Sequence, residues 1–448
     1  MNSENKHKKK SKMERGLSNR HVQVMAIAGT IGTGLFLGAG RSISLTGPSI
    51  VLVYMITGGF MYLMMRAIGE MLYQDPEQHT FINFITRYLG KGWGYFSVWS
   101  YWLSVIFIGM AEITAISHYV QFWFPSWPSW LIQVVFLTIL GLVNLIAVKI
   151  FGEVEFWFAM IATGVFMVLT GFETPYGSAS LTNISEHFSL FPNGGMNFVM
   201  AFQMVFFAYL MIEFIGVTTS ETKDPRKVLP KAVKEIPLRI IFFYGGALLA
   251  IMSIIPWREL SAADSPFVTV FELVGLKWAA ALINFVVLTS AASALNSTLY
   301  STGRHLYQIA HDSPNRFLKA IKADTLSRHN VPQNAIIASA VLIGFAAFIN
   351  VLPGVSDAFA LITASSSGVY IAIYILIMVA HLKYRKSKDF MADGYLMPQY
   401  RLLNPLTMLF FIFVFGTLFL QESTVMGARG SAIWIVAFGI YSQWKFRK

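Results

Sequence analysis

The sequence predicts an all-α integral membrane protein with twelve transmembrane helices. Of its 448 residues, 55% are hydrophobic and only 13% are charged, whereas a soluble protein carries about 25% charged residues. The charged residues lie in short islands between long apolar stretches. Lipid offers the peptide backbone no hydrogen-bond partner, so each stretch of about 20 apolar residues is expected to cross the membrane as a helix.

Glycine and proline, as in Gly47-Pro48, Pro125 and Pro192, mark the ends of the apolar stretches. Two stretches, 93–124 and 267–300, are longer than the bilayer requires, and we expect them to tilt or to project from it. The expected spans are 21–40, 47–72, 93–124, 128–148, 154–173, 196–217, 237–256, 267–300, 333–351, 356–382, 403–422 and 428–446.

The basic residues predict the orientation of the chain. All but four of the 34 lysines and arginines lie in the two termini and in alternate loops, and the exceptions are Arg41, Arg258, Lys277 and Arg429. The positive-inside rule therefore places both termini in the cytoplasm. The formal charge of +11 reflects this topology and does not indicate nucleic-acid binding. Residues 1–20 form a basic tail that we expect to touch anionic lipid.

Several function classes are disfavoured by what the sequence lacks. There is no cysteine, which excludes disulfides, thiolate metal sites and cysteine nucleophiles. No HExxH, GxSxG or P-loop pattern occurs, so an enzyme is not expected, nor is a metal or cofactor. A channel would need a continuous polar pore, whereas the spans show isolated polar positions. A solute sensor built on a transporter scaffold would be expected to carry a larger cytoplasmic module.

The middle of the first span contains three glycines within six residues, 29–34 (GTIGTG). Each glycine in a helix interior costs about 1 kcal/mol. Close packing between helices through small residues is one explanation. The other is an unwound stretch whose free N–H groups, at the start of a half-helix, bind an anionic group. A dinucleotide fingerprint is excluded because the glycine order differs and no strand precedes the run.

Two acidic residues lie inside apolar spans, Glu112 in 93–124 and Glu213 in 196–217. A buried acid in a membrane helix is costly and marks a functional site by default, although pairing with a polar group in the bundle would also explain it. Three further acids, Glu70, Glu153 and Glu155, lie near cytoplasmic span ends, where we expect solvent to reach them.

Interruptions in corresponding halves of a transporter commonly mark its site. The offset between the first and sixth spans predicts two five-helix repeats, 21–195 and 196–385, followed by two extra helices in 386–448.

Several ordered segments resemble the bacterial amino acid permeases of the amino acid–polyamine–organocation superfamily. Further matches at 47–50 (GPSI), 121–125 (QFWFP) and 283–288 (INFVVL) are most similar to the D-serine/D-alanine/glycine transporters. The resemblance implies a leucine-transporter-type 5+5 inverted repeat with the first and sixth helices broken. It also implies proton-coupled uptake of a small neutral amino acid through a bacterial inner membrane. The segments that carry it are 29–36 (GTIGTGLF), 65–70 (MRAIGE), 151–159 (FGEVEFWFA), 221–225 (ETKDP), 229–232 (LPKA), 288–293 (LTSAAS) and Asn296-Ser297.

The chain departs from the family pattern at two places. Family members usually carry a lysine in the fifth span, where this chain has Ala162. That lysine is thought to contact the unwound part of the first helix, so its absence leaves exchange without proton coupling as an alternative to symport. Leu210-Met211 stands where the family usually has at least one glycine.

An amino acid zwitterion needs donors for its carboxylate and acceptors for its ammonium. We expect the N–H groups of residues 31–34 to bind the carboxylate. The ammonium is expected at carbonyls near Ile27 and Thr30 and in residues 207–210. The expected substrate-binding residues are Ile27, Thr30, Ile31, Gly32, Thr33, Gly34, Phe207, Ala208, Tyr209, Leu210, Met211 and Ser290.

Some of these residues have more specific expected roles. Phe207 and Tyr209 are the predicted lid and side-chain wall, unless they serve ordinary packing. Ser290 is expected to face the site. Met211 would fill volume that a glycine leaves open and so favour small side chains. A carrier of larger neutral or aromatic amino acids remains open if Met211 points elsewhere. Glu112 and Glu213 are the expected proton carriers.

Overall fold

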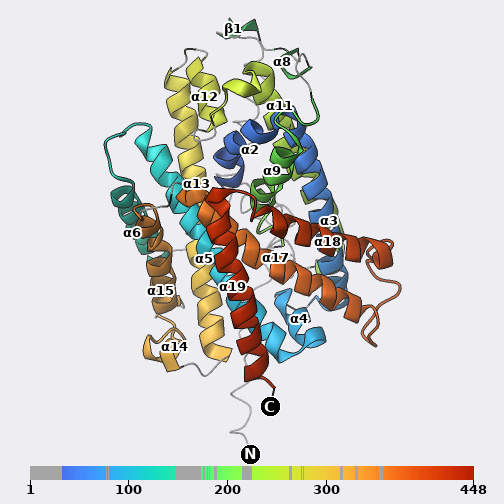
Figure 1. Cartoon of the computed structure of the whole chain (residues 1–448). Helices are drawn as coiled ribbons and strands as arrows, with labels where there is room; N and C mark the ends of the chain where they lie inside the picture. The colour runs from blue at the N-terminus through green and yellow to red at the C-terminus, as the bar shows by residue number, and fades with distance from the viewer. Residues whose placement is uncertain are drawn as a thin grey trace, which may run out of the picture.

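The computed structural model describes most of the chain, and nearly all of its regular structure is helical (Figure 1). The exception is one antiparallel pair of two-residue strands, β1 (Glu173–Thr174) and β2 (Gly177–Ser178). Two long regions lie outside the described residues: 1–32, with the basic tail 1–20 and most of the first span, and 147–172, with Glu153, Glu155, Ala162 and all but the last residue of the span 154–173. The described residues are 33–76, 78, 80–146, 173–174, 177–178, 180, 182–185, 189–213, 224–261, 265–273, 275, 277–312, 316–327, 331–352, 355 and 357–447.

Six segments within the described residues are long and apolar enough to cross a membrane, by length and composition. They are Gly38–Gln74, Lys91–Gln121, Lys277–His311, Ala358–Tyr384, Tyr400–Thr417 and Glu422–Lys445. The shorter apolar helices are Ser129–Leu145, Gly195–Ala208, Tyr244–Ile254 and Gln333–Ile349. All ten fall on expected spans, which confirms a helical protein with several apolar spans. The total of twelve spans stays a prediction.

The first half of the chain begins with helical residues 33–36, which lead into α2. The elements that follow are α2 (Gly38–Thr46), η1 (Gly47–Ser49), α3 (Ile50–Gln74), α4 (Ile82–Leu89), α5 (Lys91–Gln121), α6 (Ser129–Ile146) and α8 (Thr182–Ser185).

The second half contains α9 (Gly195–Ala208), α11 (Pro225–Ile254), η3 (Trp257–Glu259), α12 (Pro266–Leu273), α13 (Lys277–Asp312), α14 (Arg316–Ala320), α15 (Gln333–Gly344), α16 (Ala346–Ile349), α17 (Ala358–Tyr384), α18 (Tyr400–Thr417) and α19 (Glu422–Lys445).

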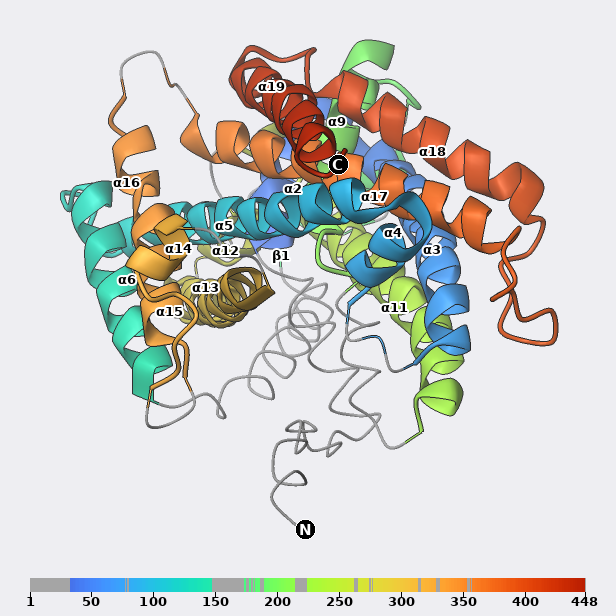
Figure 2. The same cartoon turned by 90° about the horizontal axis from the view of Figure 1, so that it is seen from below.

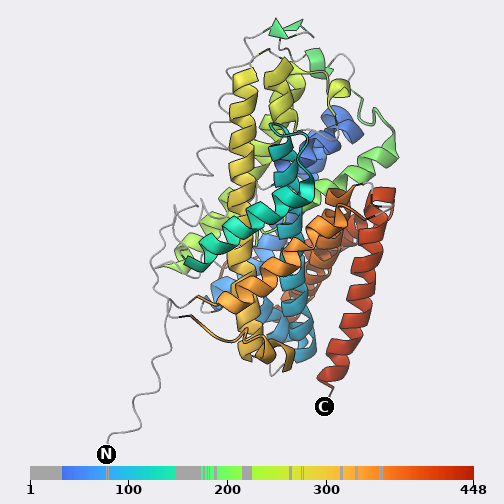
Figure 3. The same cartoon turned by 90° about the vertical axis from the view of Figure 1, so that its left-hand side faces the viewer.

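The eighth expected span differs from the structure. The sequence predicts one helix over 267–300, but the chain forms α12 and then α13, with Gly275 between them at φ +79°. A glycine with positive φ ends a helix because the backbone turns out of the helical path. The helix α13 continues to Asp312, and it runs most of the height of the molecule (Figure 3).

The centre of the molecule is α5, a buried helix that packs against α13, α17 and α4. Seen along the long axis of the molecule, α6, α13 and α15 gather toward one end of α5, and α3 and α11 lie toward the other (Figure 2). Gly109 makes a close approach possible on α5, since a Cβ there would lie 2.6 Å from the Ile343 side chain.

Near the end of α3 lies a buried ion pair that corrects a sequence-based expectation. Glu70 is only 2% exposed, so solvent does not reach it. Arg385 Nε lies 2.5 Å from Glu70 Oε1, and Arg385 Nη2 donates to Glu70 Oε2 at 2.7 Å. The backbone N–H of Met397 also donates to Oε2, at 2.6 Å. One turn earlier on α3, Arg66 donates to the Leu396 carbonyl and stacks over the Tyr395 ring. Two charged side chains of α3 thus hold the C=O and the N–H of one peptide bond in the α17–α18 loop.

A histidine of α17 lies beside this cluster. Asn404 Nδ2 donates to the Met378 carbonyl at 3.1 Å and lies 2.9 Å from His381 Nδ1. Nε2 lies 3.2 Å from Glu70 Oε2. The arrangement joins α3, α17 and α18 without exposing a charge.

Glu70→Gln is expected to lower the free energy of unfolding by about 3–5 kcal/mol, because it leaves the buried Arg385 guanidinium without a counter-charge. Thermal unfolding in detergent measures this effect. The control is Lys227→Gln, which breaks an ion pair between exposed side chains with Asp224 and should leave the unfolding midpoint unchanged. Equal midpoints for the two variants would contradict a structural role of the buried pair.

Candidate functional site

Two interrupted helices meet in the interior of the molecule. The described part of the first span begins at Thr33, whose carbonyl accepts from the N–H of Leu37 at 2.9 Å, and leads into α2. A Cβ added to Gly34 would lie 2.8 Å from the Cα of Ala208, the last residue of α9. Gly34 of the first span therefore touches the end of α9, backbone against backbone. Four expected binding residues, Ile27, Thr30, Ile31 and Gly32, lie outside the described residues.

α9 ends at Ala208, within the expected span 196–217. The chain then turns, with the N–H groups of Tyr209 and Leu210 donating to the carbonyls of Phe206 and Phe207 at 3.0 Å each. Met211 follows in the left-handed region at φ 67°. This conformation is costly for a residue with a side chain and easy for glycine. The backbone thus explains why a glycine suits this position.

The carbonyl end of α9 is partly occupied. Tyr244 of α11 donates its hydroxyl to the Ala208 carbonyl at 3.1 Å, and the Phe207 carbonyl accepts from Leu210. A carbonyl oxygen has two lone pairs, so each of these groups retains one acceptor site. Tyr244 was not among the predicted site residues. Its signal in the sequence is a tyrosine inside an apolar span, because its hydroxyl needs a hydrogen-bond partner there.

The two aromatic residues of this segment face different neighbours. Phe207 packs edge-on against Phe359 of α17, with ring centroids 6.2 Å apart. Tyr209 lies between α3 and α11, where its hydroxyl donates to the Tyr54 carbonyl at 3.0 Å and its ring contacts Tyr54 and Tyr244. Phe207 thus contacts α17, whereas Tyr209 contacts α3 and α11.

Glu112 of α5 lies beside Thr33 of the first span. Its Oε1 accepts from the Thr33 N–H at 3.2 Å, and its side chain is buried, with 3% of the residue exposed. Neither Glu112 Oε2 nor Thr33 Oγ1 has a hydrogen-bond partner. The structure thus brings together Glu112, Thr33 and Gly34.

Glu213 lies at the end of the turn, in a separate environment. It is completely buried, and Tyr374 of α17 donates to its Oε2 at 2.7 Å. Tyr370 stands one turn earlier on α17, and its ring packs against both Tyr374 and Tyr101. Ser290 is buried in α13. Among the described residues, no group of three metal-ligating side chains occurs.

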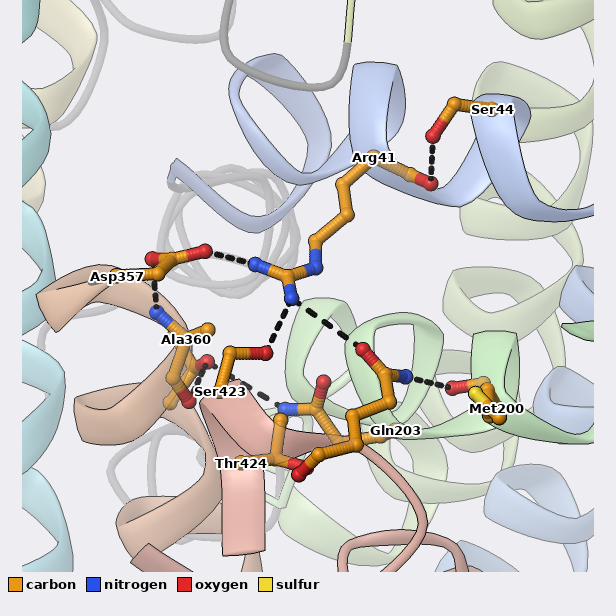
Figure 4. A network of polar contacts seen from close by, with 10 residues as sticks. Arg41, Ser44, Met200, Gln203, Asp357, Ala360, Ser423 and Thr424 are labelled. Carbon is orange, nitrogen blue, oxygen red and sulfur yellow. Dashed lines mark hydrogen bonds and ion pairs between the residues drawn. The ribbon is translucent and has the colours of Figure 1, made fainter. Parts of the chain in front are cut away.

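Arg41 of α2 contacts residues beside several other helices, as Figure 4 shows. Its guanidinium pairs with Asp357, which precedes α17, and donates to Ser423 and Gln421 beside the start of α19. Gln421 in turn donates to the Met200 carbonyl of α9 at 3.3 Å. One cation thus links α2, α9, α17 and α19 on the side where Phe359 covers Phe207.

Comparison with known proteins gives consistent matches over nearly the whole chain. The model of a family described as amino acid permease matches residues 21–444. The DL-alanine permease SerP2 of Lactococcus lactis subsp. cremoris (strain MG1363) is 49% identical over 98% of this chain and 97% of that protein. The serine permease SerP1 of the same strain is 45% identical, over 98% of each chain. The D-serine/D-alanine/glycine transporter of Escherichia coli (strain K12) is 41% identical over 96% of this chain and 93% of that protein.

Gly34→Ala is expected to destabilise the protein, because the added methyl group would collide with the backbone of Ala208. The neighbour is main chain, so the two half-helices must move apart. Thermal unfolding in detergent should show a lower midpoint. Gly59→Ala in α3 is the matched control, since nothing lies within 4 Å of its added Cβ; it should stabilise by up to about 1 kcal/mol through helix propensity. A stabilising Gly34→Ala would refute the direct contact.

Asp357→Asn is expected to loosen the Arg41 contacts that link α2, α9, α17 and α19, while the α17 helix itself stays intact. The asparagine removes the charge that pairs with Arg41 but can still accept from the Ala360 N–H, as Asp357 does at 2.8 Å, and asparagine caps as well as aspartate. Because the chain has no cysteine, a single Thr33→Cys probe reports access, and it breaks no side-chain hydrogen bond since Thr33 Oγ1 has none.

We expect a membrane-impermeant maleimide to label that probe faster in the Asp357→Asn background than in the Thr33→Cys protein alone. Circular dichroism of the variant should match that of the parent. Unchanged labelling would show that the Arg41 network does not restrict access.

Proposed function

The chain belongs to the amino acid permease family, and from this premise we propose that it carries small neutral amino acids across the bacterial plasma membrane by alternating access. The coarser part, a membrane protein of a permease family with several apolar helices, follows from the family match and the helices themselves. The finer proposal concerns alanine, serine and glycine, including their D-forms. These are the substrates that the names of the similar permeases give for those proteins.

One observation supports the proposal above all others: Gly34 of the first span touches Ala208, the last residue of α9, in a buried region. The end of α9 presents carbonyl acceptors and a negative partial charge. We propose that the glycine-rich stretch of the first span is unwound before Thr33, so that the helical residues after it present N–H donors and a positive partial charge. A zwitterion of opposite polarity fits between them. We assign its carboxylate to the N–H groups around Thr33 and Gly34, and its ammonium to the carbonyls around Ala208.

The residues at the turn support a small substrate side chain. Phe207 and Phe359 close one side of the site. Met211, 8% exposed, follows the turn where a smaller glycine would leave space. Hydrophobic pockets distinguish single methylene groups by only about 1–3 kcal/mol. Exclusion of large amino acids must therefore come from steric conflict.

Proton coupling is part of the proposal, with Glu112 and Glu213 as the carriers. Both are buried carboxyl groups next to the interrupted helices. The alternative is obligate exchange, because Ala162 stands where relatives usually carry a lysine. We further propose that both termini face the cytoplasm, that 21–195 and 196–385 are inverted repeats, and that 386–448 supplies two additional helices.

The function is tested by counterflow in proteoliposomes loaded with unlabelled alanine. We expect labelled alanine to enter, and glycine and serine to compete, whereas leucine and phenylalanine should not. Competition by phenylalanine stronger than by alanine would overturn the small-substrate proposal. Alanine-dependent thermal stabilisation without counterflow would indicate a sensor in place of a carrier.

The Met211→Gly variant sharpens the same assay. Glycine adopts the left-handed conformation of residue 211 without strain, so the turn should persist. We expect leucine to compete in this variant. Alanine entry should change by less than about twofold, which is less than the effect of one methylene group on binding in a hydrophobic pocket. If leucine remains excluded, residue 211 does not limit substrate size.

A further inference from the structure

The Thr33 N–H has two competing uses. Under the proposed function it binds the substrate carboxylate, yet the structure shows it donating to Glu112 Oε1 at 3.2 Å. Thr33 is the first described residue of the helical stretch that leads into α2, and the hydrogen bond to Glu112 comes from its backbone N–H. A side-chain carboxylate therefore occupies a donor suited to a ligand carboxylate.

We propose that Glu112 holds this donor in the substrate-free protein and that the amino acid carboxylate displaces it on binding. This inference rests on the proposed function and specifies how binding at that site is linked to a proton. Glu112 thereby couples proton binding to substrate binding through the Thr33 N–H.

The three buried acids of the described structure differ in how firmly they are held. Glu70 faces a bidentate arginine and accepts from the Met397 N–H at 2.6 Å. Glu213 accepts from the Tyr374 hydroxyl at 2.7 Å. Each of the three acids has one oxygen without a hydrogen bond, but the bond that Glu112 accepts is 3.2 Å long, longer than the 2.7–2.9 Å typical of charge-assisted bonds. Of these three carboxyl groups, Glu112 is the easiest to displace.

A displaced Glu112 cannot remain ionised at low cost. No described lysine, arginine or histidine nitrogen forms an ion pair with it. Among the described residues, the tyrosines Tyr119 on α5 itself and Tyr244 on α11 interact with it electrostatically. Neither supplies a positive charge. A buried carboxylate without a donor or a cation is strongly disfavoured, so the carboxylate takes a proton from water as it leaves Thr33. Each bound amino acid is then accompanied by one proton.

The test measures proton uptake directly. Alanine binding to the purified protein is followed by titration calorimetry at one pH in two buffers of different ionisation enthalpy. We expect about one proton taken up per alanine, and an alanine Kd that rises up to about tenfold per pH unit where Glu112 is ionised in the free protein. Glutamine at position 112 can still accept from Thr33 but cannot take a proton. Glu112→Gln should therefore bind alanine with no proton uptake and with a Kd independent of pH.

Glu259→Gln is the control, because it neutralises an exposed acid in η3 that does not touch Thr33. It should retain the proton uptake. Uptake that survives in Glu112→Gln, or that is lost equally in Glu259→Gln, would overturn the inference. Alanine binding by the unmodified protein without any proton uptake would also overturn it, and this measurement needs no variant to fold. Absence of alanine binding altogether would instead count against the proposed function.

Discussion

The contact between Gly34 and Ala208 is the constraint on which the rest of the site depends. α9 ends in the interior of the protein, and its end leaves carbonyl groups that the helix itself does not satisfy. Only a glycine allows the two backbones to approach so closely, since any Cβ would lie 2.8 Å from a main-chain atom. The neighbouring elements then complete the arrangement: Tyr244 supports the carbonyl end, and Glu112 supports the N–H end.

The three buried acids show how environment divides identical side chains among different roles. Glu70 is surrounded by strong donors and joins α3 to the α17–α18 loop, so its charge is part of the architecture. Glu213 is held by a tyrosine hydroxyl among aromatic rings. Glu112 has one long bond to a backbone donor. A group that must release its partner during a transport cycle needs weak retention, and a group that holds loops together needs the opposite.

Much of the fold could be predicted from hydropathy, because lipid forces apolar segments into helices. The described apolar helices fall on expected spans. The division of 267–300 into α12 and α13 was missed, since a glycine that ends a helix and one that packs inside it look alike in sequence; only φ +79° at Gly275 separates them. The burial of Glu70 was missed for a similar reason: a span end predicts solvent, and the loop that covers it is far away in the chain.

The sequence by itself determined that the chain is a helical membrane protein, which segments are apolar, and that the glycines of 29–34 and the acid Glu213 lie inside two of them. These properties are local, because they follow from the cost of placing glycine or charge in an apolar helix. The tertiary structure alone decided that Gly34 meets Ala208, that Tyr209 turns toward Tyr54, and that Arg41 reaches Asp357. It also decided that Glu112 takes the Thr33 N–H, a partner 79 residues distant in the chain. Hydrogen bonds depend on position and direction in space, and hydropathy contains neither.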